Sequence, residues 1–77
     1  MTLKTVTRLK TELLAKIEET MEQDGISQGE VARRIGALRN NVNKVMRKNT
    51  IPTLDLLIKM SDAVGLKVDL KIRKLKD

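Results

Sequence analysis

Residues 28–45 of the chain read QGEVARRIGALRNNVNKV. Gly36 divides this stretch, because glycine readily adopts the left-handed conformation that ends a helix. Before it, Ser27 and Glu30 have the spacing of a capping box, which predicts that a helix opens at Ser27. After it, a second helix is predicted over about 39–48. The positions expected to face inward recur at helical spacing: Val31, Ile35, Val42, Val45 and Met46. Two short helices joined by a tight turn have the layout of a helix-turn-helix.

Two further helices are predicted on either side of this pair. Apolar residues recur at intervals of three and four from Val6 to Met21, which indicates a helix of about five turns. Thr53 is a favourable N-cap for another helix over 54–64, which Gly65 ends. On the helix over 54–64, one apolar face is expected to point inward: Leu54, Leu57, Ile58 and Val64. Leu56, Met60 and Ala63 form a second apolar stripe expected to need cover from another surface. Residues 1–6 remain open between the start of the first helix, a tail and a short strand.

Apolar and charged residues alternate after Gly65, and this period of two predicts a strand over 66–75. A single strand leaves its backbone groups without partners, so we expect it to pair with the same strand of a second copy. Antiparallel registers centred on Leu70 and on Val68 both place opposite charges face to face. The register centred on Leu70 is favoured because it uses the whole strand. The rival is pairing with residues 2–6 of the same chain. The expected dimer interface comprises Leu56, Met60, Leu66, Val68, Leu70 and Ile72.

The composition excludes several classes of function. The 77 residues include no cysteine, no histidine and no aromatic residue, so a disulfide scaffold, a Cys/His metal site and a His-based catalytic triad are excluded. We therefore expect no catalytic residue, no cofactor and no enzyme activity. No apolar run exceeds three residues, which predicts a cytoplasmic protein without a membrane segment. The length allows a single domain, 1–77, whose small core favours a homodimer.

Charge is distributed unevenly along the chain. Between residues 17 and 30 there are five acidic residues and no basic one, whereas residues 31–51 contain six basic residues and no acidic one. The net charge is +6. A basic segment of this kind favours a polyanionic partner, such as nucleic acid. Of its basic residues, Arg33 or Arg34 is expected to face the acidic first helix.

Residues 26–65 resemble the helix-turn-helix region of the phage repressor/Cro and xenobiotic-response-element (XRE) family. The resemblance rests on Gln28 opening the first helix, the small Ala32 at the helix contact, Gly36 in the turn, and Val42 with Val45. It implies a mainly α, four-helix lambda-repressor-like domain, here followed by one C-terminal β-strand. One departure is Leu38, where the family usually has a Ser or Thr cap, so the third helix either frays there or starts later with Asn40 as its cap.

The resemblance also implies which residues meet DNA, with the third helix in the major groove. Arginine and lysine can donate to guanine, and asparagine can pair with adenine. The expected base contacts are Arg39, Asn40, Asn43 and Lys44, and the expected phosphate contacts are Gln28, Asn41, Arg47, Lys48 and Asn49.

Two functions fit these residues. The first is a sequence-specific, nucleoid-associated transcriptional regulator, expected to be a repressor, that binds a palindromic DNA operator as a homodimer. The second is an antitoxin that binds a toxin protein and represses its own promoter through the same helix-turn-helix.

Overall fold

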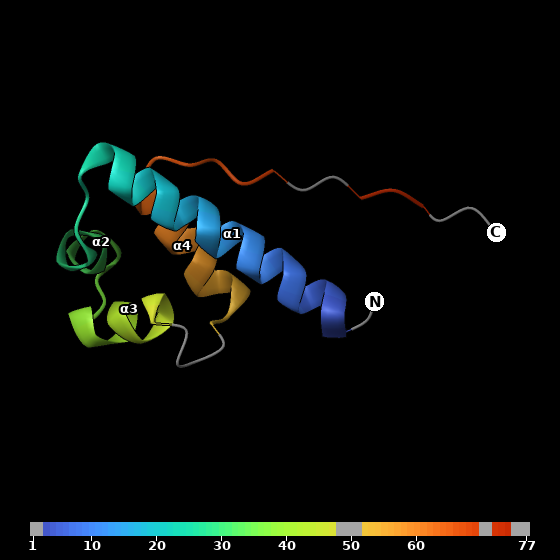
Figure 1. Ribbon diagram of the computed structural model, residues 1–77, viewed down its shortest axis with the longest axis horizontal. Helices are drawn as coiled ribbons and strands as arrows, with labels where there is room; N and C mark the ends of the chain where they lie inside the picture. Colours follow the sequence, from blue (N-terminus) through green and yellow to red (C-terminus); the bar gives the residue numbers. More distant parts are fainter. Residues whose placement is uncertain (1–2, 48–51, 70–71, 75–77) are drawn as a thin grey trace.

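The computed structural model describes residues 3–47, 52–69 and 72–74, and these contain four helices (Figure 1). They are α1 (Leu3–Asp24), α2 (Gln28–Ile35), α3 (Arg39–Met46) and α4 (Leu54–Ala63). Helix α4 packs against both α1 and α2, and α2 packs against α3. Helices α2 and α3 therefore occupy one end of the α1–α4 pair (Figure 1). The mainly α, four-helix architecture expected from the sequence is confirmed.

Local capping signals set the helix boundaries much as predicted. The Ser27 hydroxyl accepts a hydrogen bond from the Glu30 backbone N–H at 3.1 Å, and the Thr53 hydroxyl accepts one from the Leu56 N–H at 3.1 Å. Gly36 has a φ of 70°, and beyond it the Ala37 N–H donates to the Ala32 carbonyl at 2.9 Å. This arrangement satisfies carbonyl groups at the end of α2 and turns the chain toward α3.

Helix α1 begins at Leu3, so residues 3–6 are helical. Of the three possibilities for the N-terminal segment, the start of the first helix is therefore the one observed in its described part. This excludes the rival pairing of the C-terminal segment with a strand over residues 2–6. None of the four helices combines the length and the apolar character that crossing a bilayer requires, within the described residues.

The core is built from aliphatic and methionine side chains of all four helices. Those with no measurable exposure are Ile17, Val31, Val42, Leu57 and Met60. Leu14, Met21, Ala32, Val45 and Val64 complete the buried cluster. The only buried polar residue in the described ranges is Ser61, whose hydroxyl donates to the Leu57 carbonyl at 2.9 Å and so needs no water.

The prediction for the faces of α4 was right for Leu57 and Val64, which are buried, and wrong for Met60, Leu54 and Ile58. Met60, expected at a dimer interface, is 0% exposed and lies in the core of the protomer. Leu54 and Ile58, expected to face inward, are 56% and 37% exposed. The reason is that α4 packs between α1 and α2, and the buried face follows Leu57, Met60, Ser61 and Val64. Leu56 and Ala63 are half-buried beside that face.

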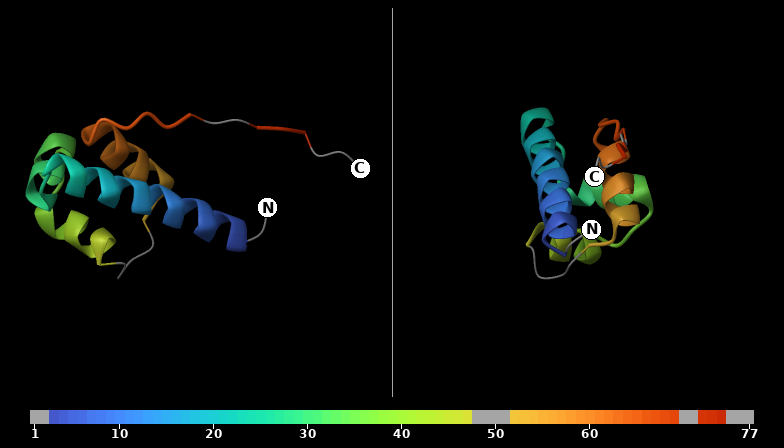
Figure 2. Two further views of the ribbon diagram at one scale, coloured as in Figure 1. Left: turned by 45° about the horizontal axis from the view of Figure 1, so that its top comes forward. Right: turned by 90° about the vertical axis from the view of Figure 1, so that its right-hand side faces the viewer.

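The predicted C-terminal strand is not formed within residues 66–69 and 72–74. Leu66 rests against the core, and its N–H donates to the Ser61 carbonyl at 2.9 Å. The chain then runs back on the outside of the helices (Figure 2), where Val68 and Ile72 are exposed. Alternation predicts which side chains share a face, but a strand also needs a neighbouring backbone, and the described protomer supplies none. Leu70 lies outside the described residues, and pairing across a dimer stays a prediction.

Candidate nucleic-acid interface

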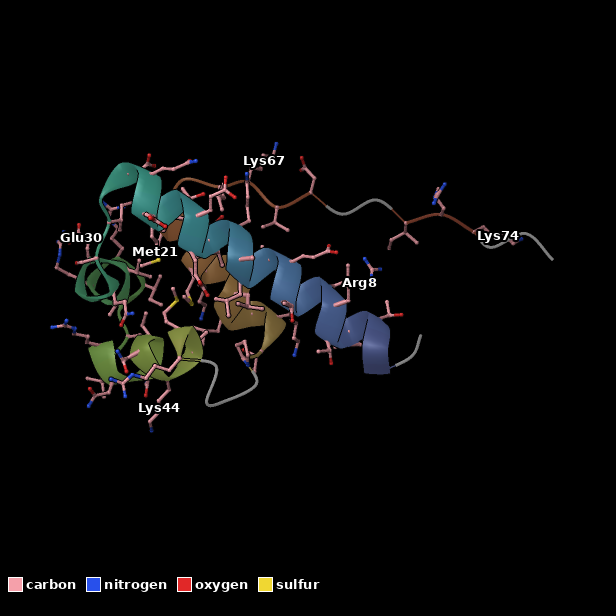
Figure 3. The ribbon with its side chains drawn as sticks, viewed as in Figure 1. Arg8, Met21, Glu30, Lys44, Lys67 and Lys74 are labelled. Atoms are coloured by element: carbon pink, nitrogen blue, oxygen red, sulfur yellow. The ribbon has the colours of Figure 1, made fainter. Side chains whose placement is uncertain are left out.

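Helix α3 is anchored by two buried valines and presents polar side chains outward. Val42 and Val45 are buried, whereas Asn40, Lys44 and Arg47 are exposed. The spacing of these three residues, i, i+4 and i+7, places them on one helix face. Figure 3 shows Lys44 pointing away from the other helices. Arg39 and Asn41 are also exposed, on either side of that face.

The start of α2 is joined to α3 by a pair of amide side chains. Asn43 donates from Nδ2 to Oε1 of Gln28 at 2.8 Å, and both residues are half-buried. This hydrogen bond therefore links α3 to the start of α2 at the edge of the exposed surface. The Gln28 Nε2 group remains a donor at the N-terminus of α2, where the free N–H groups of the first turn also favour an anion.

Glu30 neutralises much of the positive charge of α2. Its carboxylate accepts hydrogen bonds from Arg33, with Nε to Oε2 at 2.9 Å, and from Nε of Arg34 at 3.0 Å. These bonds hold the pKa of the Glu30 carboxyl below its usual value. Arg34 also donates to the Ala63 carbonyl at 2.6 Å, which fastens α2 to the end of α4. The expectation that one of these arginines faces the acidic first helix was wrong, because Glu30 on their own helix lies at the favourable i−3 and i−4 positions.

The cations of the α3 region are arranged differently. Arg39, Lys44 and Arg47 form no ion pair with any described residue. Helix α3 contains no acidic residue that would compensate them. Their charge is therefore available to an anionic partner. We call the exposed side chains of this region the α3 surface: Arg39, Asn40, Asn41, Lys44 and Arg47.

The start of α3 settles the two alternatives for its cap. The helix begins at Arg39, and Leu38 occupies the N-cap position without a side-chain hydrogen bond. Asn40 is thus part of the helix and does not cap it. The missing cap costs about 0.5–2 kcal/mol relative to serine or threonine. Leu38 is also 71% exposed, which adds an apolar side chain to the edge of the α3 surface.

Helix α1 contacts the residue that precedes the cap of α4. Lys10 of α1 donates to the Pro52 carbonyl at 2.8 Å, directly before the Thr53 cap of α4. Lys48 and Asn49, two of the expected phosphate contacts, lie outside the described residues.

The structure thus brings most of the predicted DNA contacts to one end of the molecule, because α2 and α3 meet there. Two groups of side-chain contacts in this region were not predicted from the sequence. The bond between Gln28 and Asn43 joins residues 15 positions apart and had no local signal. The cluster of Glu30 with Arg33 and Arg34 did have a local sequence signal, since the three residues are spaced i, i+3 and i+4.

A comparison with known families agrees with this geometry. A family described as "Helix-turn-helix domain" matches residues 4–73, which is nearly the whole chain. Neither a curated protein nor a solved structure matches the chain.

Proposed function

Since the chain belongs to the helix-turn-helix domain family, we propose that it is a sequence-specific regulator that binds double-stranded DNA through the α3 surface. The observation that carries the proposal is the group of cations on this surface, Arg39, Lys44 and Arg47, which no described acidic residue neutralises. Uncompensated Lys and Arg side chains attract the phosphate backbone and release its counterions. The regulator acts in the cytoplasm as a repressor on a palindromic operator, and it uses no catalytic step.

Within the α3 surface, the position of a residue along the helix separates contacts with base edges from contacts with phosphates. In helix-turn-helix complexes the N-terminal residues of the second helix reach the base edges. Arg39 and Asn40 hold those positions in α3, and Lys44 lies one turn beyond Asn40. Arg47 follows the helix and is placed for a phosphate, as are Gln28 at the start of α2 and Asn41. Asn43 supports this arrangement through Gln28.

Exchanging Arg39 and Arg47 for alanine separates these two roles. We expect Arg39→Ala to weaken binding to the preferred site by about 1–3 kcal/mol and to relax the preference at one or two base pairs. Arg47→Ala removes the same charge, so it should weaken binding to preferred and random DNA alike. Binding-site selection followed by titration of both duplexes measures the two effects. If the two patterns are reversed, the wrong end of α3 has been placed in the groove.

We also propose that the regulator is a homodimer. Apart from Leu38 beside α3, the exposed large apolar side chains among the described residues are Leu54 and Ile58 on α4, Leu9 on α1, and Val68 and Ile72 in the C-terminal segment. They replace Met60, which the core already uses. A second copy that pairs with residues 66–75 would cover the C-terminal side chains and satisfy the backbone groups beside them.

The contribution of the C-terminal segment can be measured in the full chain. Leu66 rests against the core, so we leave it intact and change Val68 and Ile72 together to aspartate. Each buried aliphatic side chain contributes about 1.5–3 kcal/mol, and four are lost per dimer, so the dissociation constant should rise more than about ten-thousandfold. Sedimentation equilibrium reports the change. Lys67→Ala, on the other face of the same segment, is the matched control. An aspartate variant that stays as dimeric as the control rejects an interface through this segment.

The second candidate is an antitoxin, and the observation that favours it is the same exposed segment. Ile72 is 82% exposed and follows a domain whose core is already closed, so it is available to another protein as well as to a second copy. Co-expression with the product of an adjacent gene distinguishes the two functions. A toxin whose growth inhibition is relieved by this chain, and not by the Val68 and Ile72 double variant, would establish the antitoxin.

A further inference from the structure

Leu38 carries two features that folding does not explain. Its side chain is 71% exposed, although it is a large aliphatic residue. It also holds the N-cap position of α3, where a serine, threonine, asparagine or aspartate would accept a backbone hydrogen bond that leucine cannot. A polar side chain at this position would be better solvated, and it could cap the N-terminus of α3. The leucine is therefore unfavourable for the isolated domain on two counts.

The backbone places Leu38 directly before the N-terminal end of α3, whose residues are proposed to contact base edges. Its φ and ψ of −76° and 141° are extended, and its carbonyl accepts the Asn41 N–H at 3.0 Å, which closes the first turn of the helix. Arg39 and Asn40 follow directly. Helix α3 lies at the end of the molecule away from the N-terminus (Figure 1). Leu38 thus borders the α3 surface, next to Arg39 and Asn40.

We propose that Leu38 contacts the C5-methyl group of a thymine in the major groove and so determines specificity at that base pair. This inference rests on the proposed DNA binding. The thymine methyl is the apolar group that base edges present in the major groove, and cytosine lacks it. Contact with Leu38 removes both apolar surfaces from water, while Arg39 and Asn40 satisfy the polar base edges beside it. The cost of an exposed, uncapped leucine in the free protein is then offset in the complex.

The test removes the methyl group from the DNA and changes nothing else. After binding-site selection with the full chain, each thymine of the selected duplex is replaced in turn by deoxyuridine. One methyl group corresponds to about a fourfold loss of affinity, and replacement in both half-sites to about fifteenfold. We expect the wild-type chain to show this loss at one thymine per half-site.

Two variants assign the effect to Leu38. Leu38→Met keeps an apolar side chain and should keep the sensitivity to the methyl group. Leu38→Ser should lose that sensitivity, bind thymine and uracil duplexes equally, and melt at a higher temperature because serine supplies the missing cap. The raised melting temperature shows that the loss does not come from unfolding.

The possible outcomes separate this inference from the proposed function. If the wild-type chain binds a selected duplex but no deoxyuridine replacement matters, DNA binding stands and the methyl contact is rejected. If Leu38→Ser retains the wild-type sensitivity, another residue makes the contact. A third outcome is that Leu38→Ser and Leu38→Met both weaken binding, and that each binds the thymine and uracil duplexes equally weakly. In that case Leu38 contacts sugar or phosphate. If no duplex is bound at all, the proposed function fails and the inference fails with it.

Discussion

Raising the salt concentration from about 50 to about 200 mM should lower the DNA affinity of the dimer roughly ten-thousandfold. Arg39, Lys44 and Arg47 are exposed and form no ion pair with a described residue, and Lys48 follows them in the sequence. If each subunit neutralises about four phosphates, the dimer neutralises about eight, and the plot of log affinity against log salt has a slope near −7. Fluorescence titration of a labelled duplex at several salt concentrations measures the slope.

Single substitutions show which charges produce that slope. Arg47→Ala removes one phosphate contact per subunit and should make the slope shallower by about 2 for the dimer. Lys16→Ala removes a cation that lies on α1 and pairs with Glu19 at 3.5 Å, so it should leave the slope unchanged. An affinity that hardly varies with salt, or equal slopes for the wild-type chain and Arg47→Ala, would contradict the assignment of the α3 surface to DNA.

Leu57→Ala should unfold most of the protein. Leu57 is 0% exposed and packs in the core where α4 meets the other helices. Removing a fully buried leucine side chain costs about 2–5 kcal/mol. A core in a chain of this size supplies only about 3–5 kcal/mol in total, and no cysteine is present to form a disulfide that would add to it. Urea titration followed by circular dichroism at 222 nm should show little or no folded baseline for the variant.

Leu54→Ala is the matched control on the same helix. Leu54 is 56% exposed, so its removal should change the free energy of unfolding by no more than about 0.5 kcal/mol. Both variants are compared at a protein concentration low enough to keep the chains monomeric, because Leu54 is available to a dimer interface. Equal stability of the two variants would show that the buried face of α4 has been placed wrongly.

Much of the helix-turn-helix could be predicted because its signals are local. A serine, threonine or glycine acts on backbone groups within a few residues, so Ser27, Gly36 and Thr53 predicted helix ends that the structure confirms. The spacing of Val42 and Val45 likewise predicted the buried side of α3, and the remaining positions of that helix followed as its exposed side. The contacts these residues make with DNA stay a prediction.

The sequence by itself therefore determined the four helices of the described residues, both caps of α2, the N-cap of α4 and the basic segment that contains α3. The tertiary structure decided which face of α4 is buried, because Leu54, Leu56, Leu57 and Ile58 are all apolar and only the positions of α1 and α2 select among them. It also decided that Asn43 pairs with Gln28 and that Arg34 reaches the end of α4. These outcomes depend on distances between residues far apart in the chain, and periodicity within one segment carries no information about such distances.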